Sequence, residues 1–485
     1  MGVYFESRVT DQGSVNYPDY EFIDVNPLFT IEGKYDRNKR NSMIATSLFE
    51  TKAMIGSGLL NVPYTFKTLG IYASVGASIL FNIVTFLSTY FLLRCKDITQ
   101  RYGYAVYSVL SMGIVGTIIC KLAILIRSIS LCCVLLKILG NIIRTILLIF
   151  FNEYGDKYYL DSKFLLVIFA LLITPLMIQK DISGINKYTS VGIFSIIYLF
   201  ASLVILFIYK YTQHEILPKK QMMLFPRGTS FEMFKCFGSY LNAYLFQVNV
   251  FPIYLPLYPR STKNMMISTA IGTILSTVIY VSFGIIGFAI YRYNIDGTLL
   301  EYIEEDLLNY IKTNKYMAAS LIIFEVAFII NTTLSTAINF FNAKQQCESI
   351  AKLIYMYIHE QNEDESIQGT PLVPLDETGA STEMPQRNTS ENNDLSDRSL
   401  NLIAFVVYII TIFIGYYSDN IITIDNFNGS TINNFLSVML PPLFFLILSP
   451  KGKFYCEKFF AILLIIFSFC LITGYFLFNF TSIFA

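Results

Sequence analysis

Long apolar stretches separated by short polar ones dominate the chain from residue 43 onward. A membrane-spanning helix needs about 20 mainly apolar residues, because the hydrocarbon core is about 30 Å thick and offers the backbone no water. The pattern predicts an all-α polytopic membrane protein with 11 transmembrane helices. These helices are expected at residues 43–67, 70–93, 112–148, 164–179, 187–210, 231–257, 264–291, 316–342, 400–417, 431–449 and 455–482.

Two polar segments interrupt this pattern. Residues 1–42 contain no apolar core, so they are expected to form a cytosolic N-terminal tail without a cleavable signal peptide. Residues 359–398 are acidic and rich in Ser and Thr, which predicts a disordered cytosolic linker. A plain tether is favoured over a phosphorylation or partner site. The membrane part therefore divides into helices 1–8, at residues 43–358, and helices 9–11, at residues 399–485.

The composition agrees with a membrane protein and excludes several other classes. Hydrophobic residues make up 54% of the chain and charged residues only 14%, which is too apolar for a soluble protein. The formal net charge is zero, so nothing indicates a nucleic acid partner. Most of the eight cysteines lie in apolar stretches without CxxC spacing. We expect a monomer in the lipid bilayer with no metal ion and no cofactor.

Basic residues in the short loops predict the orientation. Lys and Arg gather in the loops that are internal if the N-terminus is cytosolic, whereas the segments EYIEEDLLNY and SDNIITIDNFNGS then lie outside. Lys219, Lys220 and Arg227 count against this assignment. Sequons at Asn428 and Asn479 would face the outer or lumenal side. No sorting signal distinguishes a plasma membrane from a vacuolar or lysosome-like membrane.

The first and sixth predicted helices are interrupted near their midpoints. Residues 56–58, Gly-Ser-Gly, weaken the first helix. In the sixth helix, Pro252 and Pro256 remove backbone donors close to the polar Gln247 and Asn249. Small residues also serve helix packing, but interruptions at matching places in two halves indicate a midplane binding site of a secondary transporter. Spans one and six are five apart, as a five-plus-five inverted repeat requires.

A break at the midplane exposes unpaired backbone groups. N–H groups lack partners where the second half-helix starts, and C=O groups lack partners where the first half ends. The N–H groups suit a carboxylate, and the C=O groups suit an ammonium group or a cation. A zwitterionic amino acid needs both within a few ångströms, so one break can hold it.

Two stretches carry a family resemblance. KAMIGSGLLNVPYTFKTLG resembles the first-helix signature of the amino acid/auxin permease family, within the amino acid–polyamine–organocation superfamily. FQVNVFPIYLPLYPRSTKNMM is similar to the sixth helix of that family. The resemblance covers most of residues 43–482 apart from the acidic linker. It implies a LeuT-type fold, with a five-plus-five inverted repeat and one extra helix, and transport by alternating access.

The resemblance also implies a substrate site between helices one, three, six and eight. The first break would hold the substrate carboxylate, and helix six would line the site. The implied substrate-binding residues are Ile55, Gly56, Ser57, Gly58, Phe246, Gln247, Asn249 and Phe251.

Lys52 bears on the coupling ion. Sodium-coupled members of the family have Asn at this place, whereas vacuolar and proton-coupled members are similar to this chain in having Lys. A fixed ammonium can replace Na⁺ electrostatically, so we expect sodium-independent transport that is proton-coupled or facilitative. Thr332, Thr333 and Thr336 could still offer hydroxyl ligands, which keeps sodium coupling open.

Three charged residues lie within predicted spans: Lys52, Arg127 and Glu325. Each costs about 2.5 to 3.5 kcal/mol at the membrane centre on insertion scales, so each is a functional candidate. Glu325 shares a helical face with Thr332 and Thr336. It could neutralise Lys52 or Arg127, or carry a proton; a static ion pair is favoured over proton carriage.

Other function classes fit the sequence less well. A membrane-embedded enzyme would need nucleophiles, bases or metal ligands within the spans, but the two histidines, His214 and His359, fall in predicted loops. We therefore expect no enzyme. An amino-acid-sensing, transporter-like receptor stays an alternative. A channel is disfavoured because no filter motif occurs.

Overall fold

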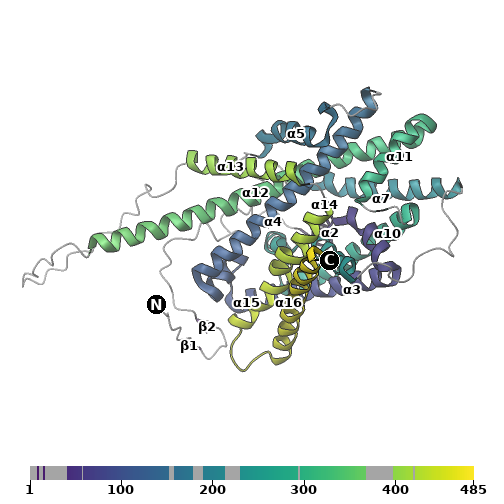
Figure 1. Cartoon of the computed structure of the whole chain (residues 1–485). Coiled ribbons are helices and arrows are strands. Elements are labelled where there is room, and N and C mark those ends of the chain that lie inside the picture. The colour runs from purple at the N-terminus through teal and green to yellow at the C-terminus, as the bar shows by residue number, and fades with distance from the viewer. Residues whose placement is uncertain are drawn as a thin grey trace, which may run out of the picture.

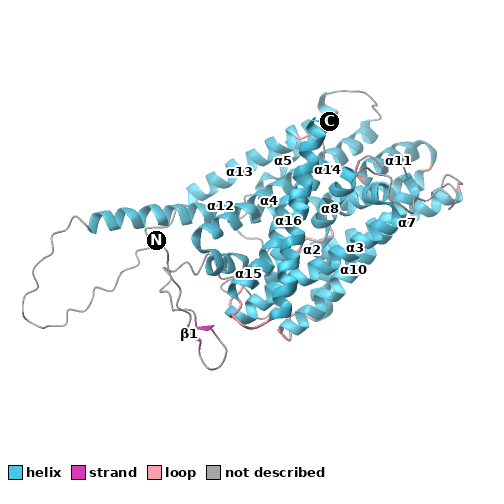
Figure 2. Cartoon of the chain, turned by 60° about the horizontal axis from the view of Figure 1, so that its bottom comes forward, coloured by secondary structure: helices cyan, strands magenta, loops and turns pink. Residues whose placement is uncertain are grey.

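The computed structural model describes residues 8–9, 15–16, 41–56, 58–151, 158–177, 189–213, 230–292, 295, 297–367, 397–418 and 421–484. Helices occupy almost all of this part of the chain and lie beside one another in a single bundle (Figures 1 and 2). The exception is a pair of two-residue antiparallel strands in the tail, β1 (Arg8–Val9) and β2 (Val15–Asn16).

The first two predicted spans form one interrupted run of helix. Helix α2 (Met43–Met54) ends at the Gly-Ser-Gly segment, and α3 (Gly58–Thr99) begins directly after it. Gly70 divides α3 with φ 75° and ψ 167°, a conformation that glycine adopts without a steric penalty. The chain turns there, so residues 58–69 complete the first span and residues 71–99 form the second.

The remaining predicted spans also coincide with helices. Gly113, at φ 68°, divides the long helix α4 (Tyr104–Phe151) in the same way as Gly70 divides α3. Span six is divided between α8 (Ser230–Ala243), the short helix η4 (Gln247–Asn249) and α9 (Val250–Tyr254). The other helices are η2 (Tyr158–Leu160), α5 (Ser162–Met177), α7 (Thr189–Thr212), α10 (Thr262–Tyr291), α11 (Leu299–Thr313), α12 (Lys315–Ile367), α13 (Asp397–Tyr417), α14 (Ile421–Asn428), the π-helical turns η7 (Gly429–Asn433) and η8 (Phe435–Met439), α15 (Leu440–Leu448) and α16 (Tyr455–Phe484).

The protein is an all-helical membrane protein. In the described part of the chain, seven helices are long and apolar enough to cross a membrane: Gly58–Thr99, Tyr104–Phe151, Phe194–Thr212, Thr262–Tyr291, Lys315–Ile354, Thr423–Leu448 and Tyr455–Phe478. Ser162–Met177 and Asn401–Tyr417 are shorter apolar helices. The half-helices of spans one and six are short because each is interrupted.

Two apolar cores hold the helices together. The larger core joins α3, α8, α10 and the helices from α14 to α16, and a smaller one lies where α4, α5, α12 and α13 meet. In the smaller core the rings of Phe340 and Tyr408 are 4.9 Å apart, and the Tyr408 hydroxyl donates to the Ala170 carbonyl at 2.6 Å. Helix α2 adds Met54 to the larger core and also makes polar contacts with α10, among them the Thr51 hydroxyl with the Gly272 carbonyl at 3.2 Å.

One segment predicted to be an outer loop is part of the buried core. The sequence places SDNIITIDNFNGS outside and begins the tenth span at residue 431, but α14 begins at Ile421. Asp425, Asn426 and Asn428 are each no more than 3% exposed. The hydropathy pattern misses this helix because its polar side chains make hydrogen bonds inside the protein. The side chain of Asn428 is buried and is not accessible to a glycan in this arrangement, and that of Asn479 lies outside the described residues.

The polar segments between and before the spans differ in part from the prediction. Helix α12 continues to Ile367, into the expected linker at residues 359–398, and α13 begins at Asp397. Residues 368–396, and most of residues 1–42, lie outside the described part of the chain. The acidic segment EYIEEDLLNY forms α11, an amphipathic helix that buries Leu300, Ile303 and Leu307.

Candidate functional site

The break in the first span borders open space. Ile55 has an extended conformation with φ −74° and ψ 97°, and its N–H donates to the Thr51 carbonyl at 2.9 Å. A Cβ added to Gly56 would meet no atom within 4 Å. The lack of a side chain here leaves the backbone accessible to a ligand. Ser57 lies outside the described residues.

The break in the sixth span is covered by its own side chains. Between α8 and η4, Phe246 is fully buried, and its N–H donates to Oε1 of Gln247 at 3.0 Å. The Phe246 carbonyl accepts from the N–H of Asn249 at 2.7 Å. The backbone groups of Phe246 are therefore paired and buried within the protein. The Gly56 carbonyl also accepts a hydrogen bond, from the N–H of Leu59 at 3.2 Å, but Gly56 itself is exposed.

The two breaks meet at the centre of the bundle. A Cβ on Gly58 would lie 2.9 Å from Cα of Ala243, so only glycine allows this approach. The hydroxyl of Tyr280 on α10 lies 2.9 Å from the carbonyl oxygen of Met54 and 2.7 Å from that of Ala243. A tyrosine hydroxyl has one hydrogen and can donate to one of these carbonyls at a time. Tyr280 thus joins the last turns of α2 and α8.

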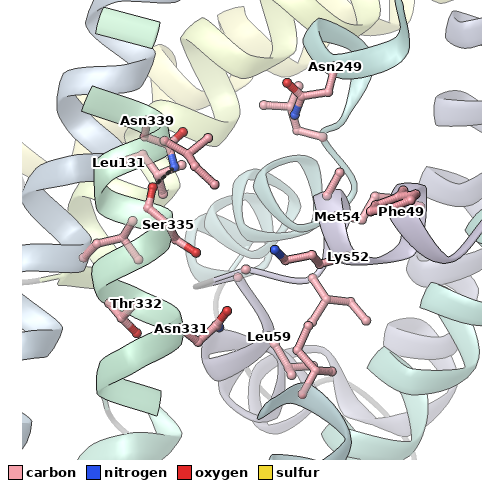
Figure 3. A pocket seen from close by; sticks show the side chains of 18 of the residues that line it. Phe49, Lys52, Met54, Leu59, Leu131, Asn249, Asn331, Thr332, Ser335 and Asn339 are labelled. Atoms are coloured by element: carbon pink, nitrogen blue, oxygen red, sulfur yellow. Dashed lines mark hydrogen bonds between the residues drawn. The ribbon is translucent and has the colours of Figure 1, made fainter. Parts of the chain in front are cut away.

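A cavity of about 730 Å³ lies beside the first break (Figure 3). This volume is in the range of small-molecule sites. Its wall on α12 carries Asn331, Ser335 and Asn339, which share one helical face because they are four residues apart. These side chains were not predicted as site residues, although polar residues at this spacing in an apolar span could have signalled them.

The cavity lies on one side of the breaks. It extends along α2 and α9 as far as Asn41, which precedes α2, and Pro256, which follows α9. On the other side, the residues of the two interrupted spans that line it are Gly58, Leu59 and Leu60 of α3 and Asn242 of α8. The bundle is therefore open beside α2 and α9 and closed beside α8 and residues 58–69 of α3.

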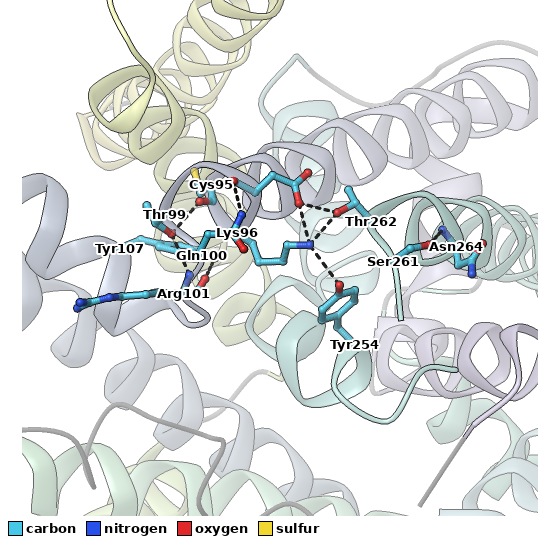
Figure 4. A network of polar contacts seen from close by, with 11 residues as sticks. Cys95, Lys96, Thr99, Gln100, Arg101, Tyr107, Tyr254, Ser261, Thr262 and Asn264 are labelled. Atoms are coloured by element: carbon cyan, nitrogen blue, oxygen red, sulfur yellow. Dashed lines mark hydrogen bonds and ion pairs between the residues drawn. The ribbon is translucent and has the colours of Figure 1, made fainter. Parts of the chain in front are cut away.

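Polar contacts hold the far ends of α2 and α9. The N–H of Asn41 donates to the Pro256 carbonyl at 2.8 Å. Lys96 at the end of α3 lies 2.7 Å from Oδ1 of Asp97 and donates to the Tyr254 hydroxyl at 3.2 Å (Figure 4). The same ammonium donates to Thr262 at the start of α10 at 2.8 Å. Helix α9 is thus anchored to α3 at its far end.

Lys52 points into the cavity from α2 (Figure 3). Its Nζ and the Oδ1 of Asn331 each lie 2.9 Å from the position that a Cβ on Gly192 would occupy. The ammonium therefore lies between α2, α7 and α12. Any side chain at position 192 would displace it.

The cavity contains part of the predicted site. The predicted residues that line it are Ile55, Gly56, Gly58, Asn249, Lys52, Arg127 and Thr332. Those that do not are Phe246, Gln247, Phe251, Glu325, Thr333 and Thr336. Phe251 instead packs against Tyr107, with ring centroids 5.6 Å apart.

The predicted ion pair of Glu325 is not formed in this arrangement. Glu325 is fully buried, and both of its carboxylate oxygens lack a hydrogen-bond partner among the described residues. Arg127 and Lys52 line the cavity, which Glu325 does not reach. Glu325 lies seven residues before Thr332 on α12, which is about 10 Å along the helix axis. This distance keeps its carboxylate away from the cavity.

The sequence as a whole matches a known family. The family model described as transmembrane amino acid transporter protein matches residues 39–481. The chain belongs to this family. The resemblance to amino acid/auxin permeases is thereby confirmed, as is the expectation that the protein is a transporter and not an enzyme.

Curated relatives from plants and animals share about a quarter or less of their residues with this transporter. Amino acid transporter AVT6E of Arabidopsis thaliana is 22% identical over 347 residues, which are 68% of this chain and 70% of that protein. Human sodium-coupled neutral amino acid transporter 7 is 25% identical over 287 residues, 57% of this chain and 60% of that protein.

Solved structures support the LeuT-type fold. MhsT in complex with L-phenylalanine aligns with a TM-score of 0.52 at 14% identity, over 91% of this chain and all of that one. MHP1, a nucleobase-cation-symport-1 family transporter, aligns with a TM-score of 0.54 at 12% identity, over 91% and 92% of the two chains. At such identities the likeness concerns the fold alone.

Proposed function

We propose that the protein is a secondary active transporter that moves amino acids by alternating access. In this proposal it has 11 transmembrane helices, ten of them in a five-plus-five inverted repeat. One observation carries the proposal: a cavity of small-molecule size meets bare backbone at the break of the first span. Membership of an amino acid transporter family gives that site its substrate class.

The substrate would bind across the first break. N–H groups at the start of α3 favour the carboxylate, because a helix N-terminus carries unpaired donors and partial positive charge. Carbonyls at the end of α2 favour the ammonium group. Asn249 would face the substrate from span six, and the side chain would extend toward Asn331 and Ser335 of α12. Phe246, Gln247 and Phe251 would support this wall from behind.

The arrangement corresponds to an inward-facing state if the N-terminus is cytosolic. The cavity then extends toward the cytosol along α2 and α9, and the opposite side is closed where Gly58 meets Ala243. We assign the protein, as a monomer, to a plasma membrane or a vacuolar or lysosome-like membrane, with residues 1–42 and the linker at 359–398 in the cytosol.

We further propose that transport is independent of sodium and is proton-coupled or facilitative. The ammonium of Lys52 lies between α2, α7 and α12, where a positive charge is already fixed beside the broken helix. A sodium ion close to this group would be repelled. Of the three hydroxyls considered as sodium ligands, only that of Thr332 belongs to a residue that lines the cavity.

The test is uptake of labelled amino acids into proteoliposomes containing the purified protein. We expect accumulation or exchange of at least one amino acid, at equal rates in sodium and choline buffers. A protein that binds amino acids without moving them would be a receptor and would contradict the proposal. Strict dependence on a sodium gradient would contradict the role given to Lys52. The matched variant Lys52→Asn should show a greater sodium response than wild type.

A further inference from the structure

Asp425 is a buried carboxylate on the closed side of the breaks. It lies in α14 and is 1% exposed. Burying an ionised carboxylate without a cation costs far more than burying a neutral acid. The surroundings of Asp425 therefore decide which form this arrangement stabilises.

The carboxyl group joins both interrupted spans to α14. Its Oδ2 lies 2.6 Å from Nδ2 of Asn61, in the second half of span one, and its Oδ1 lies 3.1 Å from Nδ2 of Asn242, in α8. Asn433 in turn donates to the Oδ1 of Asn242 at 2.6 Å. The cluster thus closes the bundle opposite the cavity, and Asn242 also lines the cavity itself.

No positively charged side chain among the described residues pairs with Asp425. Helices α8 and α4, the turn η7 and residues 58–69 surround it. The turn η7 carries no titratable side chain. In the described part of the chain, Asp425 makes no hydrogen bond or ion pair with a titratable group of α8, α4 or residues 58–69. The groups concerned include Glu232, Cys236 and Tyr240 on α8, Arg127, Cys133 and Lys137 on α4, and Tyr64 and Lys67. Its two amide partners are uncharged.

The polar cluster around Asp425 contains hydrogen-bond acceptors that no donor satisfies. The Oδ1 atoms of Asn61 and Asn433 are buried without a hydrogen-bond partner. A protonated Asp425 would supply one O–H, and of these two residues only Asn61 contacts its carboxyl group. The oxygen and nitrogen of a carboxamide are assigned from the hydrogen-bond network, so turning the Asn61 amide brings its oxygen to Asp425. The contact of 2.6 Å suits an O–H···O hydrogen bond better than an N–H···O one.

We propose that Asp425 is the proton-binding site of the transport cycle, an inference that rests on the proposed function. While the side of the bundle opposite the cavity is open, Asp425 takes a proton from water on that side. The neutral acid then allows Asn61 and Asn242 to close over it. When the cavity side opens, water that enters from the cavity beside Asn242 accepts the proton. The carboxylate that remains is costly to keep buried, so it drives the return to the first state, and one proton crosses with each substrate.

Two other buried carboxylates fit this role less well. Glu50 of α2 accepts from the Thr269 hydroxyl of α10 at 3.1 Å and touches neither α8 nor α14 through a hydrogen bond. The carboxylate oxygens of Glu325 have no hydrogen-bond partner in the described structure. Asp425 alone among the three bonds to both interrupted spans.

The test uses the full-length protein in proteoliposomes, with a mixture of the standard radiolabelled amino acids as the probe. For wild type, an external pH one unit below the internal pH should drive about tenfold accumulation, the value for one proton per substrate. Asp425→Asn should lower this accumulation to the equilibrium level, while preloaded liposomes still exchange internal for external amino acid. Accumulation by D425N at the wild-type level would overturn the assignment.

Control variants separate the inference from the proposed function. Glu457→Gln removes a carboxylate that pairs with Arg94 at 3.2 Å, and it should leave the accumulation at the wild-type level. If Glu50→Gln abolishes accumulation and D425N does not, the inference is wrong. Exchange by wild type without any response to the pH gradient also overturns the inference but leaves transport standing. Absence of both exchange and accumulation would contradict the proposed function, and the inference with it.

A second variant applies if D425N does not fold, as judged by its thermal melting. Asn61→Ala keeps the carboxyl group and removes its proposed acceptor. The neutral acid is then less stable, so the midpoint of the pH dependence of uptake should move to lower pH. No shift, or a shift to higher pH, would mean that Asn61 donates to a carboxylate, and the inference would fail.

Discussion

The breaks in spans one and six occupy matching places in the sequence but differ in what surrounds them. Gly56 borders the cavity with no atom close to where a side chain would begin, whereas Phe246 is fully buried. The difference follows from residue type. Glycine leaves the backbone bare, and Phe246 and Gln247 cover the second break and pair its N–H group. Interrupted helices in both halves therefore do not both have to present backbone to a ligand.

The two breaks have different roles. The first supplies backbone groups to the cavity, and the second holds the first in place through Ala243 and Tyr280. Substitutions at the first break should thus change transport, and substitutions at the second should change stability before they change affinity.

Gly56→Leu should have the largest effect on transport. The leucine side chain would project into the cavity and occupy the space beside the exposed backbone, so uptake should fall to background. Its Cβ meets no atom within 4 Å, so we expect little change in stability. Uptake into proteoliposomes and thermal melting together check this. Gly56→Ala is the milder control. Uptake by G56L near the wild-type rate would show that the first break does not hold the substrate.

Gly58→Ala should have the largest effect on stability. Its methyl group would meet Cα and N of Ala243 at 2.9 and 3.3 Å, and backbone cannot move aside as a flexible side chain can. Overpacking of this kind costs about 1 to 3 kcal/mol. Melting temperature should fall clearly for G58A and hardly at all for G56A. Equal melting temperatures for the two variants would mean that the breaks are not in contact.

The apolar pattern predicted much of the fold, because the bilayer requires long apolar helices with paired backbones. It failed where polar side chains are satisfied inside the protein. The hydropathy pattern predicts a loop at α14 because Asp425 and Asn426 are polar, yet Asn61 and Ser239 form hydrogen bonds with them. Such pairings join residues 364 and 187 positions apart, and no local pattern reveals them.

The candidate site was predicted in part for a similar reason. Gly56, Gly58 and Asn249 line the cavity, and the sequence indicated them because glycine and polar residues are costly in a span unless they are used. Sequence could not tell which face of the second break points inward, so Phe246 and Gln247 were expected in the cavity. It also missed Tyr280, whose part depends on two distant carbonyls.

Tyr280→Phe tests the connection between the two breaks. The Met54 and Ala243 carbonyls would both lose their shared donor, at a cost of about 1 to 2 kcal/mol in stability. The ring is kept, so packing against Tyr244 should persist. We expect a modest fall in melting temperature and slower uptake at saturating substrate. A variant with unchanged stability and unchanged maximal rate would show that the hydroxyl does not couple α2 to α8.

Gln247→Met should have the smallest effect, and it tests whether the second break, unlike the first, has no contact with the substrate. Methionine has a similar length but no strong acceptor, so the buried N–H of Phe246 loses its partner, at a cost of about 1 kcal/mol. Because Gln247 does not line the cavity, the substrate concentration for half-maximal uptake should stay within about twofold of wild type, which corresponds to less than 0.5 kcal/mol. The readouts are melting temperature and the concentration dependence of uptake. A tenfold higher concentration for half-maximal uptake, with unchanged stability, would place Gln247 against the substrate. The second break would then be a ligand site like the first.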